Sequence, residues 1–163
     1  MRAKARMLER VGGHPPERRE RRPEEAGWSM SDVVEHLVLA EAGMAAALAK
    51  EPSPERPRVL APWYRFLGLR LALVADFRIR APVESILPRR EMSWGDLVGR
   101  WEAERTRLGS WLEEVDPAKH ASPRFKHPIT GWMTVPQALT FAGDHLHHHL
   151  MQIGRIERRL GVR

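Results

Sequence analysis

The sequence predicts an all-α protein, folded as an antiparallel four-helix bundle with a short N-terminal segment. Helix start signals precede three long segments in which apolar residues recur at helical spacing. Proline-rich connectors separate the predicted helices, and no segment keeps the alternating apolar and polar pattern of a strand. We therefore expect essentially no sheet. A chain of 163 residues is long enough for one domain with its own core.

The N-terminal segment, residues 1–26, is polar and is interrupted by a Gly-Gly and a Pro-Pro pair. We expect only a short helix there, near residues 2–11, and a bundle domain that spans 27–163. Arginine and glutamate alternate between residues 17 and 25, which is more typical of a solvated linker or helix face than of a nucleic-acid-binding arm. Despite the net charge of +6, we do not expect a nucleic-acid partner.

One start signal recurs before the bundle helices. A hydroxyl residue that can cap a helix is followed, three positions later, by an acidic or amide residue that can return the hydrogen bond. The pairs are Ser29 and Asp32, Ser93 and Asp96, and Thr134 and Gln137. Together with an apolar segment between the first two pairs, they predict helices over about 30–50, 62–80, 93–115 and 135–160.

The composition limits the chemistry of the chain. It has no cysteine, which excludes disulfides, thiolate metal sites and a cysteine nucleophile. No apolar run approaches the roughly 20 residues that span a bilayer, and the N-terminus lacks the apolar core of a signal peptide. We therefore expect a cytoplasmic protein without a membrane partner. Any metal ion must be held by His, Asp or Glu side chains.

Four of the eight histidines fall within five residues of the last predicted helix. At about 100° per residue, His149 lies in the middle of the apolar arc of that helix and His145 lies at its edge. His147 is expected to face solvent, and His148, at the margin of the arc, is not expected to turn inward. On the first long helix, His36 falls inside the apolar arc.

Two inward histidines four residues apart can share one metal ion, as in the H-E-x-x-H motif, but Leu146 stands where that motif needs its glutamate. A third ligand from His36 would complete a three-nitrogen site with open positions for water or substrate, which is the catalytic pattern. The alternative is that the three histidines are satisfied core residues that hydrogen-bond one another and buried carboxylates.

Three motif blocks occur in order along the chain. They are Trp28-Ser29 with Glu35-His36-Leu37 and Glu41, then His127-Pro128 with Gly131, then His145, His149 and Gln152-Ile153. Their order and spacing resemble the DinB-like (DinB/YfiT-type) helical bundle family over about residues 27–160. The resemblance implies a four-helix bundle, often a homodimer, with a divalent metal ion, usually nickel or zinc. The three histidine ligands of the family map onto His36, His145 and His149.

Characterised members of that family include thiol-S-transferases that use bacillithiol or mycothiol, a mycothiol-dependent isomerase, and metal hydrolases. The resemblance therefore implies a divalent-metal-dependent enzyme that acts on a small electrophilic substrate. The reaction would be transfer from a low-molecular-weight thiol, or hydrolysis. The alternative is a non-catalytic, metal-stabilised helical bundle that binds a small ligand or a protein partner.

Two residues are candidates for a catalytic role. Gln152 lies on the same helix face as His145 and could orient a ligand or a bound water, although a helix-packing amide is the favoured interpretation. His127 lies in a loop, where histidine is ordinarily a surface residue, but that loop could close over the site. Glu41 faces away from His36 by about 140°, so we expect a structural role for it. Arginines at the pocket mouth could bind an anionic cosubstrate, but the sequence does not identify them.

Overall fold

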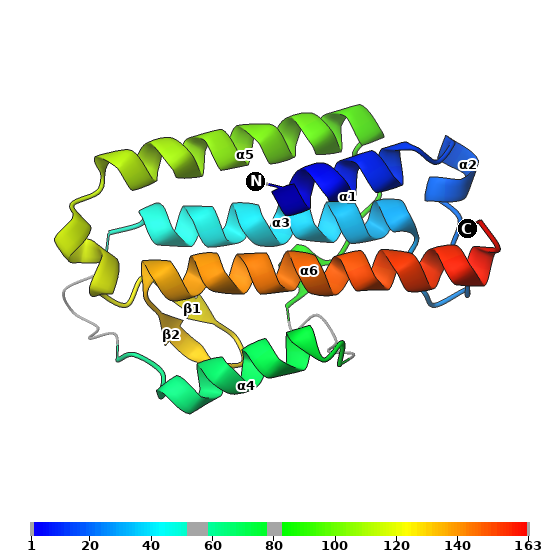
Figure 1. Cartoon of the computed structure of the whole chain (residues 1–163). Coiled ribbons are helices and arrows are strands. Elements are labelled where there is room, and N and C mark those ends of the chain that lie inside the picture. Colours follow the sequence, from blue (N-terminus) through cyan, green and yellow to red (C-terminus); the bar gives the residue numbers. More distant parts are fainter. Residues whose placement is uncertain (1, 52–58, 78–82, 163) are drawn as a thin grey trace.

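The computed structural model describes residues 2–51, 59–77 and 83–162, and it is mostly helical (Figure 1). In chain order the elements are α1 (Arg2–Gly12), α2 (Pro16–Arg19), α3 (Met30–Ala49), α4 (Trp63–Val74), η1 (Glu84–Ile86), α5 (Trp94–Glu114), η2 (Pro117–Ala121), β1 (Phe125–His127), β2 (Gly131–Met133) and α6 (Val135–Leu160). The helices predicted over 30–50, 93–115 and 135–160 are confirmed as α3, α5 and α6. The short helix expected near residues 2–11 is α1.

All three predicted capping boxes are present. In α3 the Ser29 hydroxyl accepts from the Asp32 backbone N–H at 3.1 Å, and the Asp32 carboxylate accepts from the Ser29 N–H at 2.9 Å. The boxes that begin α5 and α6 pair in the same way. α6 ends at Leu160 and is capped by Gly161, whose φ of 65° is a left-handed conformation that glycine adopts without steric cost. These local signals explain why the helix starts were predictable.

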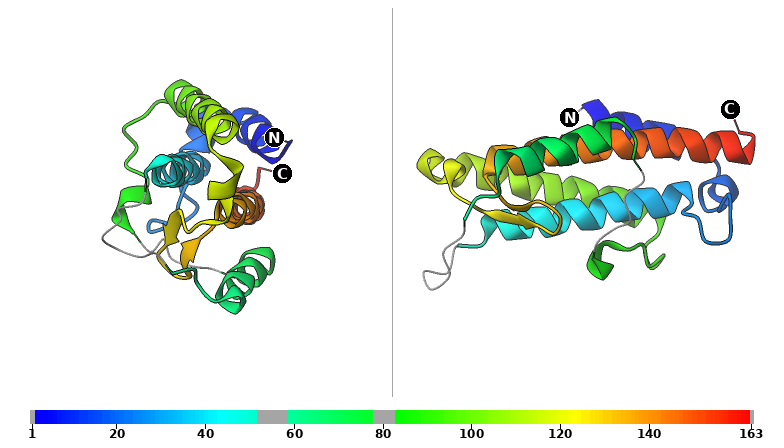
Figure 2. Two further views of the ribbon diagram at one scale, coloured as in Figure 1. Left: turned by 90° about the vertical axis from the view of Figure 1, so that its left-hand side faces the viewer. Right: turned by 90° about the horizontal axis from the view of Figure 1, so that it is seen from below.

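Four helices, α1, α3, α5 and α6, share the main hydrophobic core, and the end-on view of Figure 2 shows α4 apart from them. The fully buried core residues include Met7, Val11, Met30, Val33, Leu37, Trp101 and Ile153. The predicted four-helix bundle is confirmed, but α1 contributes to this core where the helix over 62–80 was expected. The predicted division between residues 1–26 and 27–163 stays a prediction.

α4 packs against α6 outside the main core and shares a smaller cluster with the hairpin of β1 and β2. The prediction of essentially no sheet is wrong here, because Phe125–His127 pairs antiparallel with Gly131–Met133. Strands of three residues are too short to show an alternating pattern. The helix predicted over 62–80 ends at Val74. Asp76 has a φ of 60°, a left-handed conformation in which a right-handed helix cannot continue. Residues 78–80 of that prediction lie outside the described residues.

Buried carboxylates join the bundle helices to one another. Glu41 on α3 accepts from Trp101 Nε1 at 2.8 Å and from Nε and Nη2 of Arg105 on α5, at 2.8 and 2.7 Å. Glu157 on α6 likewise accepts two hydrogen bonds from the Arg10 guanidinium on α1, one through each carboxylate oxygen. Removing one partner would leave an uncompensated buried charge, so these pairs fix how the helices are placed. The structural role expected for Glu41 is confirmed.

One face of α4 stays exposed although it is apolar. Trp63, Leu67, Leu71 and Val74 keep 72, 42, 60 and 55% of their surface accessible. An exposed apolar face of this kind is typical of a contact surface. It does not indicate a membrane crossing, because no described helix combines the length and the apolar character that a crossing needs.

Candidate metal centre

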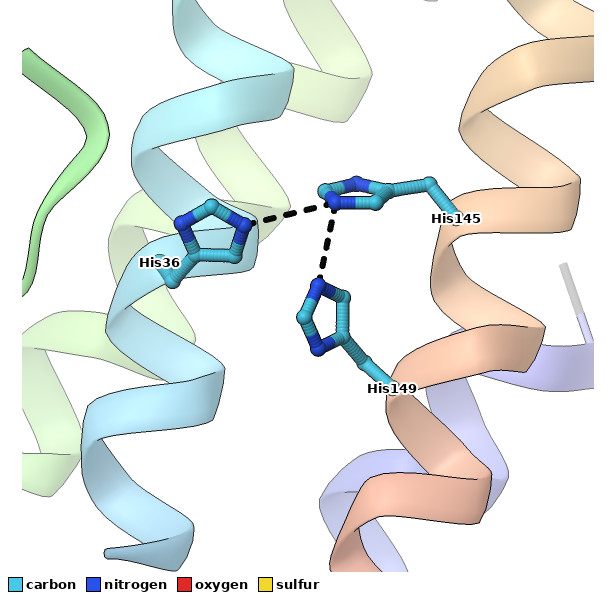
Figure 3. Close-up of side chains that lie close together, drawn as sticks. All are labelled: His36, His145 and His149. Carbon is cyan, nitrogen blue, oxygen red and sulfur yellow. Dashed lines mark hydrogen bonds between the residues drawn. The ribbon is translucent and has the colours of Figure 1, made fainter. Parts of the chain in front are cut away.

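Three imidazoles meet between α3 and α6 (Figure 3). His36 projects from α3, and His145 and His149 project toward it from successive turns of α6. Nε2 of His145 lies 3.3 Å from Nε2 of His36 and 3.0 Å from Nε2 of His149. One ligand atom from each residue lies within 4.8 Å of the other two. The fold therefore brings together the three residues that the sequence proposes as metal ligands.

Hydrogen bonds hold the outer nitrogens of two of these rings. His36 Nδ1 donates to the Ile86 carbonyl at 2.8 Å, and His149 Nδ1 donates to Gln152 Oε1 at 2.6 Å. Because a neutral imidazole carries one proton, both inner Nε2 atoms then hold a lone pair. His145 can place at most one proton between these two acceptors. The inner side of the cluster is therefore rich in lone pairs and short of protons, which suits a cation.

The spacing of the nitrogens also suits a metal ion. With metal–nitrogen bonds of about 2.0–2.1 Å, two ligands at the tetrahedral angle lie about 3.3 Å apart. The separations of 3.0 and 3.3 Å are close to that value. Within the described residues, the outer partners of His36 and His149 are a carbonyl and an amide oxygen, not the buried carboxylates of the alternative interpretation. The residues present fit a divalent ion.

Burial keeps the three rings neutral. It lowers the pKa of His36, holds the pKa of His145 well below its usual range, and lowers the pKa of His149 to about 3. Neighbouring histidines act in the same direction on His145 and His149, because two positive charges so close together repel each other. Neutral imidazole is the form that binds a metal ion, so the site is ready for one at neutral pH.

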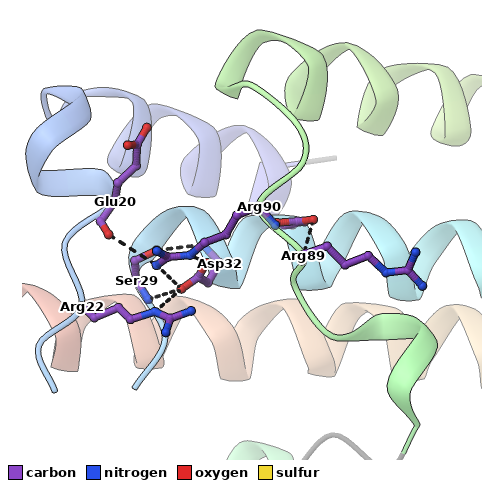
Figure 4. Close-up of polar contacts among 7 residues, drawn as sticks. Glu20, Arg22, Ser29, Asp32, Arg89 and Arg90 are labelled. Carbon is purple, nitrogen blue, oxygen red and sulfur yellow. Dashed lines mark hydrogen bonds and ion pairs between the residues drawn. The ribbon is translucent and has the colours of Figure 1, made fainter. Parts of the chain in front are cut away.

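Two carboxylates on α3 position the loop that holds His36 (Figure 4). Glu35 accepts from the backbone N–H groups of Arg89 and Arg90 at 3.0 and 2.9 Å. Asp32 accepts from the Arg90 guanidinium through both oxygens, at 2.7 and 2.8 Å. These contacts hold Arg90 at a φ of 62°, which is unusual for a residue other than glycine. The same loop supplies the carbonyl that accepts from His36.

Sequence reasoning missed this support. It assigned Asp32 only to a capping box and gave Glu35 no role. The available signal was an acidic residue directly before a candidate ligand, since ligating histidines are commonly oriented by carboxylates. Here the carboxylate orients the histidine through a loop that the sequence does not reveal.

Gln152 contacts the cluster directly, since its Oε1 accepts from His149 Nδ1. The two interpretations offered by the sequence were a helix-packing amide and a group that orients a bound ligand. The observed contact differs from both, because Gln152 fixes which nitrogen of His149 faces the other two rings.

His127 was expected at the surface of a loop, and that expectation is wrong. It lies on β1, and only 6% of its surface is exposed. Its Nδ1 accepts from the backbone N–H groups of Ile129 and Thr130 at 3.2 and 3.3 Å, which places the ring proton on Nε2. Burial lowers the pKa of His127 to about 4. Its ring packs edge-on against Phe141, which stacks on His145.

The two other clustered histidines differ from each other. His147 is exposed, as predicted. His148 was not expected to turn inward but is buried, and its Nδ1 lies 3.4 Å from Oδ1 of Asp76 at the end of α4. A helical projection gives each residue an angle, but it cannot show that α4 covers a second face of α6. His148 does not belong to the three-nitrogen cluster.

The cluster opens onto a cleft of about 1370 Å³, which His127 and Gln152 also line. Apolar side chains from α3, α4, the hairpin and α6 form much of its wall, among them Met44, Leu69, Leu73, Phe125 and Phe141. A small molecule with an apolar body can therefore approach the three nitrogens.

The chain is similar to known proteins over most of its length. The family model described as the DinB superfamily matches residues 2–153. The crystal structure of TT2238, a four-helix bundle protein, is 19% identical, with a TM-score of 0.56, and the match covers 93% of this chain and 90% of that one. YfiT from Bacillus subtilis, described as a probable metal-dependent hydrolase with an unusual four-helix bundle topology, is also 19% identical, with a TM-score of 0.56 and coverage of 99% and 83%. No curated protein matches the chain.

Proposed function

This chain belongs to the DinB superfamily, and from that premise we propose that it is a divalent-metal-dependent enzyme with His36, His145 and His149 as ligands. The convergence of three Nε2 atoms carries the proposal, because hydrogen bonds on the outer side of two rings leave their inner nitrogens free of protons. Imidazole ligands suit nickel and zinc, the ions that the family resemblance implies.

An open site supports a catalytic role over a purely structural one. Structural zinc sites are closed by four protein ligands, whereas catalytic sites keep a position for water or substrate. Within the described residues the cluster offers three nitrogens, and it faces a cleft of about 1370 Å³. YfiT, a protein of similar fold, is described as a probable metal-dependent hydrolase, which is consistent with this role.

Thiol transfer to a small electrophile is the leading reaction, and hydrolysis is the second. A bound divalent ion would lower the pKa of a thiol or of water and so supply a nucleophile near neutral pH. The described residues that line the cleft include no aspartate or glutamate to take a proton from water. A thiol has less need of such a base, since its pKa is already about 8.5. The chain has no cysteine, so the sulfur would arrive with a low-molecular-weight cosubstrate.

His127 is assigned the role of a fixed hydrogen-bond donor to the substrate. Its Nδ1 is occupied by the hairpin turn, so Nε2 carries the proton. Its pKa of about 4 keeps the ring neutral at pH 7, so it donates a hydrogen bond without transferring a proton. A donor in this position would stabilise negative charge that develops on the electrophile as the new bond forms.

The test is conjugation of monochlorobimane with bacillithiol, mycothiol or glutathione, by protein loaded with nickel or zinc. We expect turnover with at least one thiol, and we expect it to disappear when the metal is chelated. His149→Ala should also be inactive. His147→Ala is the matched control, because His147 lies on the same helix but is exposed, and it should keep full activity.

Failure with every thiol would reject thiol transfer. Hydrolysis of activated esters and amides by the same metal-loaded protein then tests the second reaction. If neither activity depends on metal, the enzyme proposal is wrong, and the non-catalytic, metal-stabilised bundle becomes the better account.

A further inference from the structure

The charged side chains that line the cleft in front of the histidines, among the described residues, are all positive. Among the described residues, its lining contains five cationic side chains and no aspartate or glutamate, although the chain has 21 acidic residues. The cations are Lys50, Arg124, Lys126, Arg155 and Arg159. A cleft lined by one sign of charge concentrates the opposite sign, because its low-dielectric walls focus the field.

Some of these charges are compensated from outside the cleft. Arg155 pairs with Asp76 and Arg159 pairs with Glu24, while Nη2 of Arg124 lies 3.6 Å from the Glu51 carboxylate. Lys126 differs from these three, because within the described part of the chain it has no acidic partner. It is exposed, directly precedes His127 on β1, and its ammonium lies 6.0 Å from the centre of the Trp132 ring.

A metal ion held by these three histidines would make the cleft more positive. Three neutral imidazoles would leave the full charge of a divalent ion uncancelled, unlike a site that contains carboxylate ligands. With no carboxylate among the described lining residues, nothing in that part of the cleft would offset this charge. The apolar wall formed by Met44, Leu69, Leu73 and Phe125 favours an apolar body next to the acidic group.

We infer that the cleft selects a small organic anion, a carboxylate with an apolar body, and that Lys126 recognises its acidic group. This inference rests on the proposed function, because it names the substrate class of the same site. Lys126 would bind the acid at the hairpin end of the cleft.

The experiment compares 4-phenylbutyrate with 4-phenylbutyramide, which have nearly the same shape but differ in charge. Binding is measured by calorimetry at low salt on the full chain, both metal-loaded and metal-stripped. We expect the acid to bind about tenfold more tightly than the amide to the metal-loaded protein, and we expect part of this preference to remain after the metal is removed.

Three variants assign the effect to Lys126. Lys126→Gln should weaken binding of the acid about fivefold and leave binding of the amide unchanged. Lys126→Arg should restore the affinity for the acid to within about twofold, because it keeps the charge. Arg6→Gln is the matched control: it removes one positive charge from the exposed side of α1, and no residue of α1 lines the cleft. It should have no effect.

Equal affinity for the acid and the amide would overturn the inference, and so would equal effects of Lys126→Gln and Arg6→Gln. Elemental analysis separates this failure from failure of the proposed function. A protein that binds no metal but still prefers the acid would contradict the proposed function and support this inference. A metal-loaded protein that does not distinguish the acid from the amide would contradict this inference and leave the proposed function supported.

Discussion

Gln152 offers a sensitive test of how the site is built, because it touches a proposed ligand but not the proposed ion. Its Oε1 accepts from His149 Nδ1 at 2.6 Å. Replacing it with leucine keeps a side chain of similar size but removes the acceptor. The ring proton of His149 is then free to move to Nε2, where it would block the lone pair that faces His36 and His145.

The expected loss follows from this contact. Removing an outer partner of a ligating histidine typically costs 10- to 100-fold in metal affinity, or about 1.4–2.7 kcal/mol. We therefore expect Gln152→Leu to bind zinc about 10- to 100-fold more weakly than the unmodified protein. Gln152→Glu keeps an oxygen acceptor at the same position, so its affinity should stay within about threefold.

Affinity can be measured by competition with a fluorescent zinc chelator at pH 7.5, with circular dichroism to confirm that each variant keeps its helices. A Gln152→Leu protein that is folded and binds zinc as tightly as the unmodified protein would refute the reasoning. In that case Gln152 would be the packing amide that the sequence favours.

Three further predictions concern other parts of the molecule. His127→Ala should keep its metal but lose about 10- to 100-fold in turnover, and His127→Gln, which retains an N–H donor, should recover part of it; loss of metal from either variant would contradict a donor role. Burial raises the pKa of Glu157, but hydrogen bonds from Arg10 and His14 outweigh it and lower the pKa below its usual 4.5. The carboxylate therefore stabilises the fold above pH 4.5, and this contribution is lost as the pH falls through the lowered pKa. Glu157→Gln should melt about 4 °C lower than the unmodified protein at pH 6, and this difference should shrink as the pH is lowered below 4.5; a difference that stays constant down to the acid unfolding of both proteins would contradict this. The homodimer that the family resemblance implies stays a prediction; if it forms through the exposed face of α4, Leu71→Glu should halve the mass seen in sedimentation, and an unchanged mass would exclude that surface.

The features that the sequence predicted well are local or periodic. Capping boxes depend on residues three positions apart, so the starts of α3, α5 and α6 could be located from the chain alone. The inward direction of His36, His145 and His149 follows from helical periodicity. The family motifs select the same three residues, and the fold brings their nitrogens together.

The features that it missed depend on contacts between distant segments. Glu35 binds the backbone of Arg89, 54 positions away, and Asp76, just beyond the end of α4, lies against His148 of α6. The composition of the N-terminal segment is polar on average, yet Met7 on one face of α1 is completely buried in the bundle. Mean polarity hides such a narrow stripe, and a single-chain pattern does not reveal which helix covers which face.

The central claim, that three histidines from two helices bind one divalent ion, is tested most directly by metal content. The unmodified protein, His36→Ala, His149→Ala and the control His147→Ala would be purified with nickel or zinc supplied, and the metal per chain measured by elemental analysis. The account predicts close to one ion per chain in the unmodified protein and in His147→Ala, and almost none in His36→Ala and His149→Ala. Equal metal in all four proteins would contradict it.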